Sequence, residues 1–345
     1  MKLLKKIILD TLNGLSIGIV VSLVPGALVN QLIKALVPHW PGLGFILVLT
    51  TFASSLLPAI SAVCVGMTAK LSPIQTSSLA LAATAAAGNF TMQNGKIHVM
   101  GSGDVINTAI TIMIAYGLVL FFGQKLKAYT ILLVPLLVLV IAGGIGILTL
   151  KPVGQFTALI GIGVEHLMSL QPIIMGIIMG IIFGFLIVSP ISSVGIATAI
   201  GLSGIASGSA NLGITAVGFA LAVFGWKANS LGTSLAHFLG SPKMQMANLM
   251  TKPKLLIPVL LNAGILGGIG AIFKISGTPM SAGFGFSGLI GPITAMAGRS
   301  SNFANIMLII ILFFILPIAL ALITNYIFNN KMHFFSAKDF ELDYK

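Results

Sequence analysis

The chain has 345 residues, of which 57% are hydrophobic and 7% are charged. Because an average soluble domain carries about 25% charged residues, this composition excludes an ordinary soluble protein and indicates a membrane protein. Eighteen lysine and arginine residues against six acids give a formal net charge of +12. The basic residues stand singly or in small groups between apolar runs, as topological anchors do, so we predict no nucleic-acid partner.

The N-terminal segment MKLLKKIILDTLNGLS repeats apolar residues at helical spacing, with Lys2, Lys5, Lys6 and Asp10 on the other side. This pattern predicts an interfacial amphipathic helix that leads into the first span. A span requires roughly 20 apolar residues, so the sequence predicts an all-α polytopic membrane protein with about ten transmembrane elements and one or two re-entrant hairpins. The candidate spans are residues 14–37, 43–67, 74–91, 105–123, 129–150, 156–170, 173–188, 191–226, 255–275 and 302–328.

Two regions combine small residues with asparagine. The first, SSLALAATAAAGN, ends at Asn89, and the second, Ile191–Gly218, contains 18 Gly, Ala, Ser or Thr among 28 residues. Weakly helical backbone at membrane depth is tolerated where protein buries it or where it lines a wet cavity. In the second region Ser207, Ser209 and Asn211 alternate, which favours an unwound tip that coordinates a neutral polyol. Hydrogen bonding between closely packed helices is the alternative interpretation.

Glycines mark two further features of the second half. Gly176, Gly180 and Gly184 form a GxxxGxxxG face, which predicts close contact between helices. The segment Ser276–Gly298 is too polar and glycine-rich for a lipid-facing helix, yet too apolar for an ordinary loop. Because interrupted segments often form the binding sites of transporters, we expect it to line a solute site together with Ile191–Gly218.

The lysines orient these elements by the positive-inside rule. Three lysines stand near the N-terminus, and Lys243, Lys252 and Lys254 form the densest later group. We therefore expect the N-terminus and residues 241–254 to lie in the cytoplasm. The tail 329–345 mixes lysines with three acids and is expected there too.

One carboxylate and two histidines are candidates for function. Glu165 lies in the apolar stretch GQFTALIGIGVEHLMSLQP, where an ionisable group is costly unless it is paired or hydrated. It could bind sugar hydroxyls or a coupling proton; alternatively, Glu165 and His166 face water from an interfacial helix. His237 could bind a solute or serve in packing. The single cysteine, Cys64, lies in an apolar run, and no histidines have metal-ligand spacing, so we predict neither a metal, a cofactor nor a catalytic centre.

An ordered set of motifs runs from Pro190 to Pro292. PISS opens the small-residue run, then come GTS, KMQMAN, a basic stretch and the glycine-rich SAGFGFSGLIGP. This order resembles the phosphotransferase-system IIC-like membrane family that includes the perfringolysin regulator and is similar to IIC subunits of the bacterial sugar phosphotransferase system. Where that pattern has Arg-Glu-Asn, this chain has Lys227-Ala228-Asn229, so the acid is absent.

The resemblance implies a fold of the glucose-type IIC superfamily, a homodimer and a place in a bacterial cytoplasmic membrane with both termini in the cytoplasm. It divides the chain into an amphipathic helix with a scaffold and interface half (1–150), a substrate half with re-entrant hairpins (151–330) and a short cytoplasmic tail (331–345). It also implies that a glutamate and a histidine bind sugar, for which Glu165 and His237 are candidates, and that the sugar moves by an elevator-like motion.

The resemblance further implies separate IIA and IIB proteins if the sugar is phosphorylated, because no such domain is attached here. They would dock at residues 241–254 and at the Lys125–Lys127 loop. We predict a non-enzymatic transporter of a sugar or sugar derivative by alternating access, with a membrane-embedded solute sensor or regulator, or an ion-coupled transporter that uses Glu165, as alternatives. The candidate substrate-binding residues are Asn89, Glu165, His166, Ser207, Ser209, Asn211, Lys227, Asn229 and His237.

Overall fold

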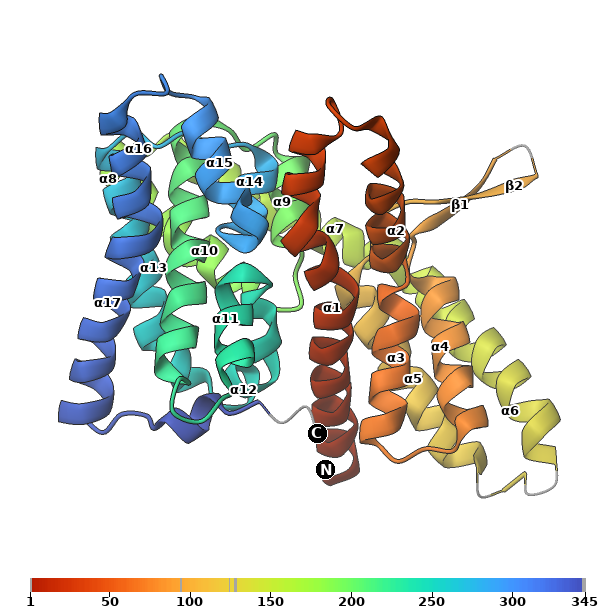
Figure 1. The fold of residues 1–345 in the computed structure, drawn as a ribbon. Coiled ribbons are helices and arrows are strands. Elements are labelled where there is room, and N and C mark those ends of the chain that lie inside the picture. The colour runs from red at the N-terminus through yellow and green to blue at the C-terminus, as the bar shows by residue number, and fades with distance from the viewer. Residues whose placement is uncertain (1, 94, 124, 127–128, 343–345) are drawn as a thin grey trace. The chain divides into compact units, whose positions relative to one another are not determined.

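The structure is a computed structural model that describes residues 2–93, 95–123, 125–126 and 129–342. The chain forms two compact units. Unit 1 comprises Met1–Gly26 and Ile33–Phe156, and unit 2 comprises Ala27–Leu32 and Thr157–Lys345. Each unit is built mainly from helices, and a short two-stranded hairpin adds to unit 1 (Figure 1).

Six helical runs among the described residues are long and apolar enough to cross a membrane, or seven if the bent pair α2–α3 forms one span. These runs confirm a helical multi-pass membrane protein, but the expected count of about ten spans and the re-entrant hairpins are not confirmed. Several apolar stretches instead form helices too short to span; that at Pro172–Ile187 has 16 residues. The six runs are Leu3–Leu36, Val105–Phe122, Thr130–Leu167, Gly204–Phe224, Pro253–Ile272 and Phe303–Lys331.

Unit 1 begins with one continuous helix that contains both the predicted amphipathic segment and the first span. The helix ends before η1, and the α2–α3 pair bends by 51° where Leu56 separates the two helices. A capping box formed by Ser72 and Gln75 starts α4. The elements are α1 (Lys2–Leu36), η1 (Pro41–Leu43), α2 (Gly44–Ser55), α3 (Leu57–Thr68), α4 (Pro73–Ala86), β1 (Phe90–Gln93), β2 (Lys96–Val99), α5 (Val105–Gly123), α6 (Thr130–Val138), η3 (Leu139–Gly143) and α7 (Gly144–Leu167), whose end reaches into unit 2.

A buried asparagine holds three helices of unit 1 together. The Asn107 side-chain amide of α5 donates to the carbonyl oxygens of Ala86 at 2.7 Å and Gly146 at 2.8 Å. Its Oδ1 accepts from the Thr149 hydroxyl at 2.7 Å. Every polar atom of this side chain is therefore bonded, which makes its complete burial stabilising rather than costly.

Unit 2 contains short helices that interrupt the connections between longer ones. Residues 188–203 connect α8 to α10 and contain α9, while residues 273–289 follow α13 and contain α14. The elements are α8 (Pro172–Ile187), α9 (Ser193–Ala199), α10 (Gly204–Phe224), α11 (Leu231–Leu239), η4 (Pro242–Gln245), α12 (Met246–Thr251), η5 (Pro253–Leu255), α13 (Leu256–Ile272), α14 (Pro279–Phe284), η6 (Ser287–Leu289), α15 (Ile290–Ala297), α16 (Phe303–Ile310), η7 (Ile311–Ile315), α17 (Leu316–Asn325), η8 (Tyr326–Lys331) and η9 (Ala337–Phe340).

The centre of unit 2 is α10, which packs against α8, α13 and α17 and is buried along almost its whole length (Figure 1). Glycines allow these backbones to meet. A Cβ added at Gly180 would lie 2.3 Å from the Ala263 carbonyl oxygen, and one at Gly213 would lie 2.4 Å from the Gly180 Cα. The close contact predicted from the GxxxGxxxG face is therefore confirmed.

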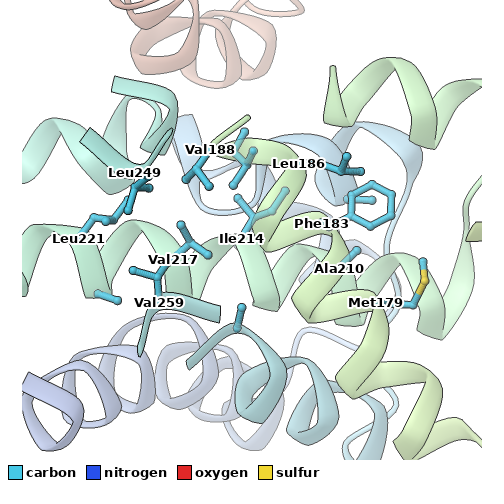
Figure 2. Close-up of a cluster of buried hydrophobic side chains, with 14 of the residues drawn as sticks. Met179, Phe183, Leu186, Val188, Ala210, Ile214, Val217, Leu221, Leu249 and Val259 are labelled. Carbon is cyan, nitrogen blue, oxygen red and sulfur yellow. The ribbon is translucent and has the colours of Figure 1, made fainter. Parts of the chain in front are cut away.

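Around the glycine contacts, larger side chains complete the core of unit 2. Figure 2 shows Ile214, Val217 and Leu221 of α10 among side chains of α8, with Val259 of α13 and Leu249 of α12 nearby. All of these side chains are buried. Close glycine contacts and a filled apolar core together make α8, α10 and α13 a tightly packed group.

Candidate functional site

The two interrupted connections of unit 2 meet beside the N-terminal half of α10. The Gly277 amide donates to the Gly204 carbonyl oxygen at 3.0 Å, and the Ser207 hydroxyl donates to the Thr278 carbonyl oxygen at 2.7 Å. The Ser193 hydroxyl, on α9, donates to the Gly283 carbonyl oxygen of α14 at 2.7 Å. Segments 70 to 90 residues apart in the sequence are thus held together by hydrogen bonds from small side chains and backbone.

The backbone changes direction sharply where the second connection passes α10. Gly285, Gly288 and Leu289 all have positive φ angles, of 60°, 56° and 60°. A Cβ at Gly285 would lie 2.4 Å from the Ile214 side chain of α10, so glycine meets both a conformational and a steric need there. Leu289 is a branched residue in the left-handed region, which stores local strain in this segment.

Asn211 is buried where this second connection crosses α10. Its Nδ2 donates to the Gly291 carbonyl oxygen at 3.2 Å, while its Oδ1 has no hydrogen-bond partner among the described residues. A Cβ at Gly291 would lie 2.3 Å from that Oδ1. Asn211 therefore offers an unused acceptor at the contact between α10 and the residues that begin α15.

Ser209 faces a different neighbour. Its hydroxyl, which also has no partner among the described residues, lies against α8, because a Cβ at Gly176 would be 3.0 Å from its oxygen. Residues two apart on a helix do not share a face, so Ser209 and Asn211 point to different sides of α10.

The expectation of an unwound tip was wrong: Ser207, Ser209 and Asn211 lie in the regular helix Gly204–Phe224, and the break precedes it. Packing within the unit provides enough contact for a glycine- and serine-rich stretch to remain helical.

Glu165 and His166 occupy the last turn of α7, and both are exposed. The Nδ1 of His166 lies 2.8 Å from the carbonyl oxygen of Ile162, one turn earlier. Among the described residues, none forms a hydrogen bond or an ion pair with the Glu165 carboxylate. The structure therefore does not join these two residues to the hydrogen-bonded group around Asn211.

His237 lies in a separate buried cluster with Gln245. Its Nε2 is 3.1 Å from the Gln245 Nε2, and its Nδ1 is 3.2 Å from the Ser234 carbonyl oxygen. Because an amide nitrogen only donates, the imidazole Nε2 must accept, and the proton of a neutral ring lies on Nδ1. Burial lowers the pKa of His237 from 6.5 to about 4, so the ring is neutral at pH 7.

Asn229 binds the C-terminal segment instead of facing an open site. Its Nδ2 donates to the Phe340 carbonyl oxygen at 2.8 Å, and its Oδ1 accepts from the Leu342 amide at 2.8 Å. The Phe340 ring is fully buried and contacts the Phe224 ring at a centroid distance of 5.5 Å. The predicted tail is thus packed against the end of α10 up to residue 342, and residues 343–345 lie outside the described residues.

The same C-terminal segment contacts the predicted cytoplasmic stretch 241–254. Gln245 Nε2 donates to the Phe340 carbonyl oxygen at 2.6 Å, and Asn248 Nδ2 donates to that of Glu341 at 2.9 Å. Lys252 forms an ion pair of 2.6 Å with Asp339, whose pKa this lysine helps to lower. The other expected docking loop, Lys125–Lys127, includes residue 127, which lies outside the described residues.

Lys243 is a buried cation that the sequence pattern did not distinguish from the other lysines. Its ammonium is buried and donates to the carbonyl oxygens of Ser189, Leu186 at 3.3 Å and Ile191 at 2.8 Å, where α8 ends. A cation at the C-terminus of a helix complements the helix dipole, although burial lowers the pKa of Lys243 to about 7. In the sequence Lys243 belongs to a lysine-rich stretch, and no sequence pattern distinguishes it from the exposed lysines that orient the chain in the membrane.

The remaining two candidates lie apart from these clusters. Asn89, in unit 1, is buried and donates to the Ser55 carbonyl oxygen at 2.7 Å, which ties the start of the hairpin to the end of α2. Lys227 is exposed and lines a pocket of about 300 Å³ with Trp226 and asparagines near the end of α17. The nine candidate residues are therefore distributed over several places and do not form one site.

Comparison with known proteins adds one finding. A family model described as phosphotransferase system, EIIC, matches residues 9–342 of the chain. The match extends over both compact units and includes every candidate residue discussed above. No curated protein and no solved structure matches the chain.

Proposed function

The chain belongs to the phosphotransferase-system EIIC family, and on this premise we propose that it carries a sugar or a sugar derivative across a bacterial cytoplasmic membrane. As a member with several apolar membrane-spanning helices, it is a multi-pass membrane transporter of the phosphotransferase type. The chain itself performs no chemistry in this proposal. Any phosphate added to the sugar comes from separate IIA and IIB proteins.

The observation that carries the proposal is the unused acceptor of Asn211. A buried polar atom without a partner costs about 1–3 kcal/mol, so its presence calls for an explanation such as a ligand. Interrupted helices are where transporters commonly bind solutes, and Asn211 lies against such a segment. A sugar hydroxyl could donate to Oδ1 once Gly285–Gly291 moves away from α10.

The same arrangement supports a mechanism of alternating access. The closely packed group α8, α10 and α13 is suited to move as one body with the solute, in an elevator-like motion, while unit 1 serves as scaffold and homodimer interface. Support comes from the division of the chain into two compact units and from the glycine contacts within unit 2. We place the solute in unit 2 and assign Asn89 of unit 1 a structural role.

The phosphorylating partners are expected to dock near the stretch 241–254, with both termini in the cytoplasm. Its lysines Lys252 and Lys254 are exposed, whereas Lys243 and Gln245 are buried. Asp339 of the packed C-terminal segment pairs with Lys252, so a partner would meet both segments together.

Uptake of labelled sugars into proteoliposomes tests the proposal. We expect one or a few members of a sugar panel to be taken up, and Asn211→Ala to reduce that uptake about tenfold, the effect of losing one hydrogen bond of about 1.4 kcal/mol. Asn262→Ala is the matched control: Asn262 is equally buried in unit 2, but its amide bonds Pro258 and Thr324. Its uptake should stay near that of the native protein when corrected for folded protein.

The same assay separates the alternatives. A folded protein that neither binds nor takes up any sugar of the panel would contradict the proposal. Stabilisation by a sugar without flux would identify a sensor. Uptake that requires a pH gradient and loses this requirement in Glu165→Gln would identify an ion-coupled transporter.

A further inference from the structure

One pocket of unit 2, separate from Asn211, lies where two membrane-spanning runs end. The run Gly204–Phe224 ends beside it, and the run Phe303–Lys331 contributes Asn325, Asn329 and Asn330 to its wall. Trp226, Lys227 and four apolar or small residues complete the lining, and the volume is about 300 Å³. This is enough for a small polar group, and neither Glu165, Asn211 nor His237 lines it.

Charge in this pocket is one-sided. Of the residues that the structure describes, Lys227 is the only charged one in the lining, and none of the lining residues is an acid. Among the described residues, none accepts a hydrogen bond from the Lys227 ammonium or forms an ion pair with it. An exposed, unpaired cation at the edge of a partly enclosed pocket favours an anionic ligand.

The asparagines provide the neutral donors that such an anion requires. Asn325 is the last residue of α17, and Asn329 and Asn330 lie in η8, a π-helical turn. In a π-helix the hydrogen bonds join residues five apart, so residues four and five positions after Asn325 flank it on one side. Asn325 and Asn329 are already close, with Nδ2 of Asn329 lying 3.4 Å from Oδ1 of Asn325. Together with one lysine, amide groups on one wall suit a ligand with several acceptor oxygens, such as a phosphate.

The position of the pocket indicates the source of that phosphate. Tryptophan and lysine immediately after a span are typical of the level of lipid headgroups, and Trp226 is 50% exposed. Exposed Leu322 and half-buried Val223 add apolar surface beside the polar groups. A soluble phosphate would not use that apolar surface, whereas the glycerol and acyl chains of a lipid would.

We propose that this pocket, formed by Trp226, Lys227 and the three asparagines, binds the phosphate of an anionic lipid headgroup. Basic pockets between transmembrane helices are suited to this role. Ala337 of the packed C-terminal segment also lines the pocket. A bound lipid would therefore contact α10, the end of α17 and this segment together. Lipid binding in this pocket depends neither on the identity of the solute nor on the transport mechanism.

The full chain in detergent allows a direct test, because it has only two tryptophans. Trp40→Phe leaves Trp226 as the only tryptophan, beside the pocket. Lipids brominated in the acyl chain quench nearby tryptophan, so phosphatidylglycerol and phosphatidylcholine with the same brominated chains are compared as a function of mole fraction. We expect saturable quenching at a lower mole fraction with phosphatidylglycerol.

Lysine substitutions in this background identify the headgroup contact. Lys227→Ala should raise the half-saturating mole fraction of phosphatidylglycerol about fivefold, as expected for one lysine near an anionic surface. Lys331→Ala is the matched control, since Lys331 is an exposed lysine of η8 that lies over Tyr326 and outside the pocket lining. Its titration should equal that of the parent.

Three outcomes would overturn the proposal. Quenching by the two lipids could be equal, which would show that the headgroup is not recognised. The two lysine variants could shift the titration equally, which would show only a general effect of charge. Finally, complete displacement of phosphatidylglycerol by millimolar inorganic phosphate would show that the pocket binds the free anion and does not require a lipid. Circular dichroism confirms that each variant is folded.

Discussion

At the scale of single residues, the contact between His237 and Gln245 determines a protonation state. The Gln245 amide donates to both the imidazole and the Phe340 carbonyl oxygen, so a second proton on the imidazole would oppose an existing donor. The cluster lies between α11, η4 and the C-terminal segment. A charge on His237 would therefore disturb the packing of all three elements.

This arrangement predicts a dependence of stability on pH. Burial lowers the pKa of His237 from 6.5 to about 4. Between these values the unfolded chain binds a proton that the folded chain does not bind, so stability falls as the pH is lowered from about 6.5 to about 4. We expect the thermal unfolding temperature of the detergent-solubilised protein to fall across this window, and His237→Gln to flatten the fall.

His166→Gln is the control for this measurement. His166 is exposed, and its ring contacts only the carbonyl oxygen of Ile162 among the described residues. The variant should keep the pH dependence of the native protein. An equally steep fall in His237→Gln would show that other groups, such as the paired Asp339, determine the acid sensitivity.

The residue types that the sequence singled out were informative, but their surroundings were not predictable. Asn211 and His237 were recognised because polar groups are costly in apolar segments, and both are buried. Asn229 was selected through a motif, yet its amide binds the C-terminal segment more than 110 residues later. Contacts over such a separation depend on how helices pack, which periodicity within a segment does not specify.

At the scale of elements, the interrupted connections decide how solute could reach α10. The second connection is bonded to α10 through Gly277 and Thr278, and it turns at Gly285, Gly288 and Leu289, which have positive φ angles. The glycine-rich composition of Ser276–Gly298 predicted an irregular segment, and the structure has the short elements α14, η6 and α15 there, with breaks between them. The number of spans was harder to predict, because hydrophobic runs do not show where a helix breaks.

If the second connection must leave α10 to admit solute, then a covalent link between them should stop transport. A Cβ at Gly277 would lie 2.5 Å from the Ser207 hydroxyl oxygen, and in a disulfide the corresponding Cβ to sulfur distance is about 3 Å. We expect Ser207→Cys with Gly277→Cys, in a Cys64→Ala background, to form a disulfide under mild oxidation. Sugar uptake should then fall to background and return after reduction.

Each single-cysteine variant serves as a control for oxidation, because it cannot form the link. These variants should take up sugar equally well before and after oxidation. Full uptake by the cross-linked protein, with the disulfide verified by mass spectrometry, would show that this connection need not leave α10 at Gly277. Any opening toward Asn211 would then be confined to Gly285–Gly291.

At the scale of the whole molecule, the chain separates into two compact units within a single family match. Unit 1 packs α3, α4, α5 and α6 around one apolar core, and unit 2 packs α8, α10 and α13 around another. Composition alone was sufficient to predict a multi-pass membrane protein. The family followed from the order of motifs in the second half, since composition is shared by unrelated membrane proteins.

An elevator-like motion makes a prediction for distances within and between the units. Spin labels at Ile174 of α8 and Ile257 of α13, both exposed and both in unit 2, should keep one distance distribution with and without a transported sugar. A label at Met67 of unit 1 paired with Ile257 should show a distribution that shifts by several ångströms when sugar is added, because in such a motion the units move as separate bodies. Pulsed electron paramagnetic resonance in a Cys64→Ala background measures both pairs. Sugar-dependent change confined to the Ile174–Ile257 pair would argue for rearrangement inside unit 2 in place of rigid-body motion.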